Sequence, residues 1–170
     1  MNKKTRQYIG ILVAIITYYI IHEGAHLIYA LSIGVFKQIN FLGLGIQIDV
    51  HAERMTDVQM GIFCIVGSVA TALCAYLLIA STGWVGKSES KVFKACMYYI
   101  TIALLLLDPS YLSVLCDFVG GGDMNGIALL VPKTMAQVMY GGLLVIHVGL
   151  LIKLVVPRYK QMFQEEKQNM

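Results

Sequence analysis

The feature that most constrains this chain is a series of apolar segments, each about as long as a lipid bilayer is thick. A helix needs about 20 apolar residues to cross the hydrocarbon core. The segments run from about Tyr8 to Ile33, from Val58 to Trp84, from Lys94 or Ala95 through Leu107, and from Ala136 to about Val156. Only 14% of the residues are charged, well below the roughly 25% of soluble domains. The sequence therefore predicts an all-α polytopic membrane protein with about four transmembrane helices.

The third apolar segment leaves the number of helices open. It meets Asp108 and Pro109 and then a Gly-rich stretch at residues 120–126, so a division within residues 95–131 gives a five-helix alternative. The length predicts a single domain over residues 1–157, followed by a polar C-terminal tail at 158–170. We expect the N-terminal apolar segment to stay uncleaved, because it is longer than the apolar region of a signal peptide.

The connection between the first two apolar segments has a different pattern. Phe41–Val50 carries glycines and β-branched residues with partial alternation, which is typical of a strand or hairpin. Beside an active site, such a membrane-associated β element could hold an extended substrate by edge pairing. An ordinary loop with some β character is the alternative, and the residues favour neither one.

A short motif places ionisable side chains inside the first apolar segment. Residues 22–26 read His-Glu-Gly-Ala-His, and Glu23 is the only charged side chain between Arg6 and Lys37. An ionisable group in hydrocarbon is costly, so its presence needs a reason. Residues i and i+4 share one face of a helix, so His22 and His26 can bind one zinc ion while Glu23 acts on a zinc-bound water. A His/Glu cluster satisfied within the bundle without metal is the alternative.

A catalytic zinc ion usually has three protein ligands, so the histidine pair leaves one to be found. The candidates are the acidic and imidazole side chains elsewhere in the chain: Asp49, His51, Glu53, Asp108, Asp117, Asp123 and His147. Asp123 ranks first, because the Gly-rich backbone around it can bend and approach a metal closely. Asp108, which directly precedes Pro109 in an apolar segment, ranks second. His147 is better explained as a packed or hydrogen-bonded residue than as a ligand.

These motifs resemble the site-2 protease family of intramembrane zinc metalloproteases. That family places His-Glu-x-x-His in one transmembrane helix and a metal-binding Asp in a Gly-flanked segment of a later helix. The resemblance implies one Zn²⁺ per chain, held by His22, His26 and Asp123, with Glu23 as the general base. One departure is that the family commonly has Gly directly after the Asp, whereas Met124 stands there in this chain.

The resemblance extends to two neighbouring segments. It implies that Phe41–Val50 corresponds to the membrane-associated β element of the family. It also implies that Gly67 and Ser68 stand where the family often has Gly-Pro in its second core helix. Small residues let helices approach closely in lipid, so we expect this face of the second segment to pack on the helix that carries the motif.

The predicted function is that of a zinc metalloendopeptidase acting on membrane-embedded substrates. Its partners would be a membrane protein or peptide substrate, the lipid bilayer and a regulatory membrane protein. No basic patch is interleaved with aromatic residues, which argues against nucleic acid. The alternatives are a membrane zinc hydrolase of a non-peptide substrate and a non-proteolytic metal-binding protein, such as a transporter or a pseudoprotease. We expect a multi-pass integral protein of a bacterial cell membrane.

The orientation in the membrane is left open by two opposed signals. Basic side chains cluster before the first apolar segment, between the second and third, and after the fourth. In a four-helix protein all of these clusters fall on one side, which the positive-inside rule makes cytoplasmic. The resemblance implies the opposite orientation, and we give the charges slightly more weight.

Overall fold

The computed structural model describes residues 2–42 and 45–168, with the side chains of Leu42 and of residues 165–168 excepted. Four helical stretches of the described chain are long and apolar enough to cross a membrane. They are α1 (Lys3–Ser32), α2 (Asp57–Ala80), the stretch Lys91–Val119 and the stretch Lys133–Gln164. The predicted all-α membrane fold with about four spanning helices is confirmed.

Polar caps decide where the long helices begin. The Asn2 side chain accepts a hydrogen bond from the Thr5 amide at the start of α1, 2.8 Å away. Thr56 and Gln59 form a capping box at the start of α2, and the Ser90 hydroxyl accepts from the Phe93 amide at the start of the third stretch. Caps satisfy amides that the first helical turn leaves without partners. These three helices therefore begin between one and five residues before their apolar segments.

The third stretch stays continuous through Pro109. It consists of α4 (Lys91–Ser110), a π-helical turn η2 (Tyr111–Leu115) and α5 (Cys116–Val119). Pro109 has no amide hydrogen for the Leu105 carbonyl, and His147 Nδ1 lies 2.6 Å from that carbonyl instead. Because a neighbouring helix supplies the missing donor, the helix does not end at the proline. The five-helix alternative is therefore wrong.

The last stretch is also continuous and includes most of the predicted tail. It consists of α7 (Lys133–Leu150), a second π-helical turn η3 (Leu151–Val155) and α8 (Val156–Gln168). The residues predicted as a polar tail therefore continue the last helix as far as Gln168. A short helix, α3 (Thr82–Gly86), joins α2 to α4.

Strands rather than a loop follow α1. β1 (Phe36–Leu42) and β2 (Gly45–Val50) pair antiparallel, from Leu42 opposite Gly45 to Phe36 opposite Val50. A short 3₁₀ turn, η1 (Ala52–Arg54), leads on to α2. The hairpin predicted near residues 41–50 is confirmed, and it starts five residues earlier than the predicted segment.

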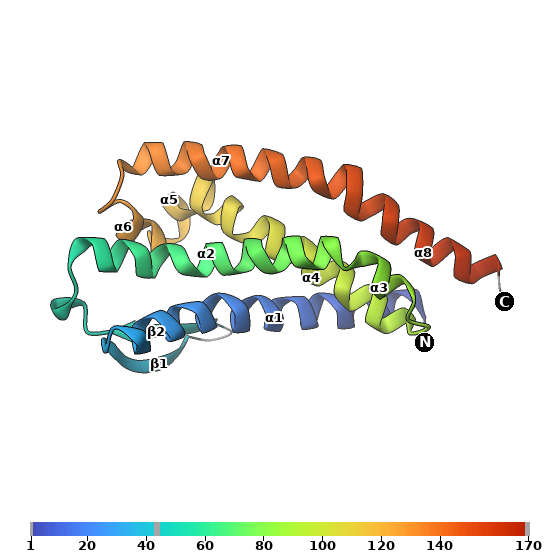
Figure 1. The fold of residues 1–170 in the computed structure, drawn as a ribbon, viewed down its shortest axis with the longest axis horizontal. Coiled ribbons are helices and arrows are strands. Elements are labelled where there is room, and N and C mark those ends of the chain that lie inside the picture. The colour runs from blue at the N-terminus through green and yellow to red at the C-terminus, as the bar shows by residue number, and fades with distance from the viewer. Residues whose placement is uncertain (1, 43–44, 169–170) are drawn as a thin grey trace.

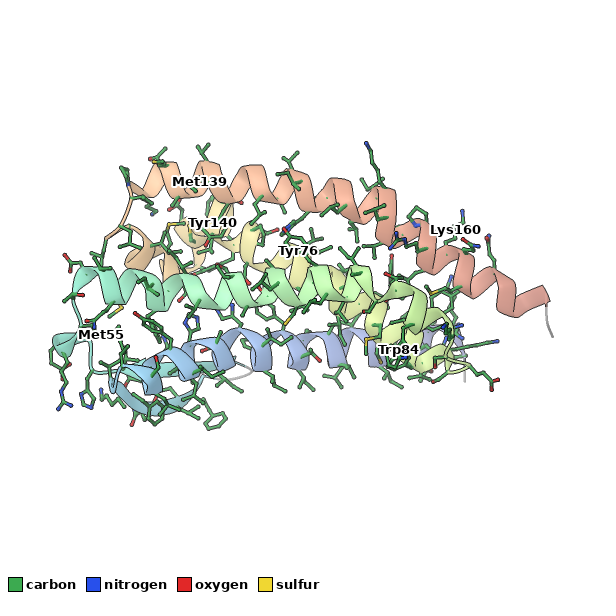
Figure 2. All side chains as sticks on the ribbon, viewed as in Figure 1. Met55, Tyr76, Trp84, Met139, Tyr140 and Lys160 are labelled. Carbon is green, nitrogen blue, oxygen red and sulfur yellow. The ribbon has the colours of Figure 1, made fainter. Side chains whose placement is uncertain are left out.

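The two ends of the bundle differ in what they carry. Figure 1 shows α2 and α4 between α1 and α7, with both termini and α3 at one end of the bundle. The β-hairpin lies at the opposite end with the short helix α6 (Asp123–Ile127). The hydroxyl groups of Tyr140 on α7 and Ser68 on α2 form a hydrogen bond of 2.8 Å. Tyr140 lies on the side of the bundle away from α1 (Figure 2).

Candidate metal site

The two histidines of the motif meet inside the bundle. His22 and His26 both lie on α1 and are buried. Their Nε2 atoms are 3.1 Å apart, as expected for i and i+4 positions on one helical face. The Phe63 ring of α2 contacts the His26 ring, with 4.7 Å between the ring centroids. One face of α1 therefore presents two ring nitrogens to the interior of the protein.

Gly67 of α2 provides the space for these imidazoles. A Cβ atom at this position would lie 2.6 Å from His26 Nε2 and 2.8 Å from His22 Nε2. Such distances are shorter than van der Waals contact, so any larger residue would displace the rings. The predicted close packing of the small-residue face of α2 on α1 is confirmed at this position.

The Gly-rich segment folds back to bring a carboxylate to the histidines. Gly120 and Gly122 have φ of 95° and 42°, values that L side chains rarely adopt. The Tyr111 hydroxyl donates to the Gly120 carbonyl at 2.8 Å and holds the turn. The reversal places α6 against α2, and Asp123 becomes the first residue of α6.

Three atoms with lone pairs converge at this point. Asp123 Oδ2 lies 3.1 Å from His22 Nε2 and 3.5 Å from His26 Nε2. Ligand atoms bound to one zinc ion at about 2.0–2.2 Å in tetrahedral geometry are separated by about 3.3–3.6 Å. A proton on one of the ring nitrogens, or a cation shared by all three atoms, would satisfy these lone pairs in the buried site. His22, His26 and Asp123 could therefore hold a metal ion.

Contacts with the two histidines favour the ionised form of Asp123. Burial acts to raise the pKa of its carboxyl group. The hydrogen bonds with His22 and His26 and the charges of those rings outweigh burial and lower this pKa to about 2. An ionised carboxylate is the form that binds a metal.

Asp108 lies behind the histidines rather than beside Asp123. It is 2% exposed, and its Oδ1 atom is 3.1 Å from His22 Nδ1. The hydroxyl groups of Tyr18 and Thr71 both donate to this carboxylate. Asp108 does not hydrogen-bond the backbone carbonyl that Pro109 leaves free, because His147 lies against that carbonyl. A carboxylate that accepts from the outer nitrogen of a ligating imidazole fixes its tautomer and its orientation.

Glu23 borders the same space from the next position of α1. A cleft of about 310 Å³ is lined by the imidazoles of the motif, Glu23, Asp123 and residues 46–48 of β2. The Ile48 amide donates to a Glu23 carboxylate oxygen at 3.2 Å. The amide of Ile48 therefore points away from β1, so the free edge of β2 faces the cleft.

The remaining candidates for a third ligand lie elsewhere. Asp49 pairs with Lys37 at 3.0 Å and Asp117 pairs with Lys133 at 2.5 Å, and neither lines the cleft. His51 pairs with Glu53 at 2.9 Å, at the start of the 3₁₀ turn η1. His147 is fully buried and hydrogen-bonded, as expected of a packed residue.

Two residues of the site were not predicted from the sequence. Tyr18 stands four residues before His22, so it shares the face of α1 that carries the motif. Thr71 stands four residues after Gly67 and shares the face of α2 that contacts the imidazoles. The helical period could have placed both residues near the site, but it could not show that both bond Asp108.

Comparisons of the chain with known proteins add no information on this site. No protein-family model matches the chain, and no curated protein or solved structure is significantly similar to it. The candidate site therefore rests on the contacts of the chain itself.

Proposed function

We propose that the chain is an intramembrane zinc metalloprotease of the site-2 type, which hydrolyses peptide bonds of membrane-embedded substrates. The observation that carries the proposal is the convergence of His22, His26 and Asp123 beside the Glu23 carboxylate in one cleft. A binding or transport protein needs ligand atoms but has no use for an acid at this position. The donor set of two imidazoles and one carboxylate is one that catalytic zinc uses.

The proposed chemistry divides the tasks among five side chains. Zinc, when bound, polarises the scissile carbonyl and acidifies a water molecule. Glu23 accepts the proton of the attacking water and passes it to the leaving amine. His22 and His26 hold the metal together with Asp123, and Asp108 fixes the His22 ring through Nδ1.

The free edge of β2 supports a peptide rather than a small molecule as the substrate. The outward-facing backbone of Ile46 and Ile48 borders the cleft, and an extended chain can add to such an edge by main-chain hydrogen bonds. In doing so it would take over the Ile48 amide and release Glu23 for proton transfer. A transmembrane substrate must unwind locally to present such a strand.

We further propose a multi-pass topology with the termini in the cytoplasm. The basic clusters that contain Lys3, Lys87 and Lys160 lie at the end of the bundle that holds both termini. The positive-inside rule assigns this end to the cytoplasm. The cleft and the hairpin then lie nearer the opposite face of the membrane.

Exchanging Glu23 for Gln tests the catalytic role, because the amide keeps the shape of the side chain but cannot take the proton. Wild-type and Glu23→Gln proteins are reconstituted in liposomes with a panel of single-span substrates, and new termini are identified by mass spectrometry. We expect zinc to be retained and turnover to fall by about 10²–10⁴-fold. Glu53→Gln, an exposed acid outside the cleft, is the control.

Three results would contradict the proposal. Turnover of Glu23→Gln near the wild-type rate would remove Glu23 from the reaction. A wild-type protein that holds zinc but cleaves no substrate in the panel would favour the non-proteolytic alternatives, a transporter or a pseudoprotease. Release of a non-peptide product from the lipids would favour the zinc hydrolase of another bond.

A further inference from the structure

A second cavity lies at the opposite end of the bundle from the metal site. It has a volume of about 610 Å³ and lies between the first turns of α1, the first half of α4, and α8. Its wall combines basic side chains with aromatic rings: Lys3, Arg6, Lys91, Lys160, Tyr98, Tyr99, Tyr159 and Phe163. Figure 2 shows Lys160 at the end of the bundle where Trp84 also lies, far from Met55 near the hairpin.

The described side chains that line this cavity carry positive charge. Among residues 2–42 and 45–164, whose side chains the structure describes apart from Leu42, no acidic residue lines it. Lys3, Arg6 and Lys160 form no ion pair with any acidic side chain that the structure describes. At the hairpin end, by contrast, Lys37 and Lys133 each pair with an aspartate. Several basic groups gathered around one cavity favour an anionic ligand.

The aromatic residues give the cavity an amphipathic wall. The Arg6 guanidinium lies 5.7 Å from the centroid of the Phe163 ring, which connects α1 to α8. Tyrosines are enriched where membranes meet water, because the ring suits the apolar side and the hydroxyl the polar side. Such a wall suits a ligand with a charged head and an apolar body better than it suits a free ion.

We propose that this cavity binds the headgroup of an anionic phospholipid, with Lys3, Arg6 and Lys160 around the phosphodiester. Basic pockets between membrane helices bind such headgroups. The end of the bundle that carries the cavity is also the end that the positive-inside rule places at the cytoplasmic leaflet, where anionic lipids carry the surface charge. A lipid held there bridges α1, α4 and α8. This inference does not depend on the proposed protease function, but it uses the proposed orientation of the bundle.

The test compares two double variants that remove the same charge. Arg6→Gln/Lys160→Gln removes two basic groups from the wall of the cavity, whereas Lys4→Gln/Lys87→Gln removes two that do not line it. Full-length proteins in micelles are titrated with phosphatidylglycerol or with phosphatidylcholine of the same acyl chains, and bound lipids are counted by native mass spectrometry. Inorganic phosphate in lipid-free micelles forms a third arm.

We expect the wild type to retain phosphatidylglycerol in preference to phosphatidylcholine. The cavity variant should bind phosphatidylglycerol about tenfold or more weakly, because each basic group near anionic lipid contributes on the order of 1 kcal/mol. The control variant should keep most of the preference, and circular dichroism should show that both variants are folded. Binding of phosphatidylcholine should not change in either variant.

Three outcomes would overturn the inference. A wild type that does not distinguish the two lipids has no site for the anionic headgroup. Equal losses in the two double variants would show a diffuse surface charge effect rather than a cavity. Inorganic phosphate that binds as tightly as the lipid would assign the cavity to a free anion instead.

Discussion

Two sets of buried imidazoles can be compared within this bundle. His147 has a partner at each ring nitrogen, the Tyr76 hydroxyl 2.7 Å from Nε2 and the Leu105 carbonyl 2.6 Å from Nδ1. At His22 and His26 the Nε2 atoms instead point at each other and at a carboxylate. Both sets lie in apolar helices and both are buried. The difference lies in whether the hydrogen bonds of the surrounding protein satisfy the nitrogens.

The comparison separates a structural histidine from a candidate ligand. His147 has a structural role, because its Nδ1 atom hydrogen-bonds the backbone carbonyl that Pro109 leaves without an amide donor. The Nε2 atoms of the motif contact only one another and the Asp123 carboxylate, and a shared cation would satisfy all of them at once. Burial of a histidine in an apolar helix therefore says little by itself, and the direction of its lone pairs distinguishes the two roles.

The largest effect is expected for His26→Ala, which removes a nitrogen from the convergent set. Purified wild-type protein should carry about one zinc per chain, and the variant close to none. The measurement is metal content by plasma mass spectrometry after zinc supplementation. His51→Ala, at an exposed turn outside the cleft, should keep its zinc. A folded, metal-free wild type would place His22 and His26 in the same class as His147.

A smaller loss is expected for Asp108→Asn. The amide keeps the shape of the side chain but no longer offers a carboxylate to His22 Nδ1, so the ring loses its fixed tautomer. Mutations of such supporting groups cost about 10–100-fold in metal affinity, measured by competition with a chelator. Asp117→Asn, which disturbs an exposed ion pair instead, should leave zinc affinity unchanged. Complete loss of zinc would make Asp108 a ligand and would remove Asp123 from that role.

Gly67→Ala should displace the imidazole rings of His22 and His26 without changing any of the proposed ligand atoms. The added methyl group would displace the rings, and overpacking of this kind costs about 1–3 kcal/mol. Part of this free energy would oppose the ring positions that bind the metal, so we expect zinc binding to be roughly threefold to tenfold weaker. Gly142→Ala on α7, where the new methyl group meets no atom within 4 Å, is the matched control. Equal affinities for both variants would show that α2 does not constrain the site.

The smallest effect on zinc is expected for His147→Phe. An aromatic ring is kept, but the Leu105 carbonyl loses its donor and the Tyr76 hydroxyl its partner, so thermal unfolding should show a stability lower by about 1–3 kcal/mol. Zinc content should not change. Adding Pro109→Ala restores a backbone amide for that carbonyl and should recover part of the loss, a coupling that a double-mutant cycle measures. A loss of zinc in His147→Phe would erase the distinction between the two sets of histidines.

The sequence by itself determined the periodic features of the protein. The apolar segments predicted four helices, and the spacing of His22 and His26 placed both rings on one face of α1. The pattern of residues 41–50 favoured strand as much as loop, and the hairpin is present. These features are local, because the helical and strand periods depend on residues that are close together in the sequence.

Only the tertiary structure decided which carboxylate meets the histidines. Asp108 and Asp123 both reach His22, from opposite sides of the ring. The Gly120–Gly122 reversal brings Asp123 to Nε2, whereas continuation of α4 through Pro109 brings Asp108 to Nδ1. That continuation depends in turn on His147, which lies 42 positions from Leu105. Contacts between distant segments arise from packing, and no local period of the sequence encodes them.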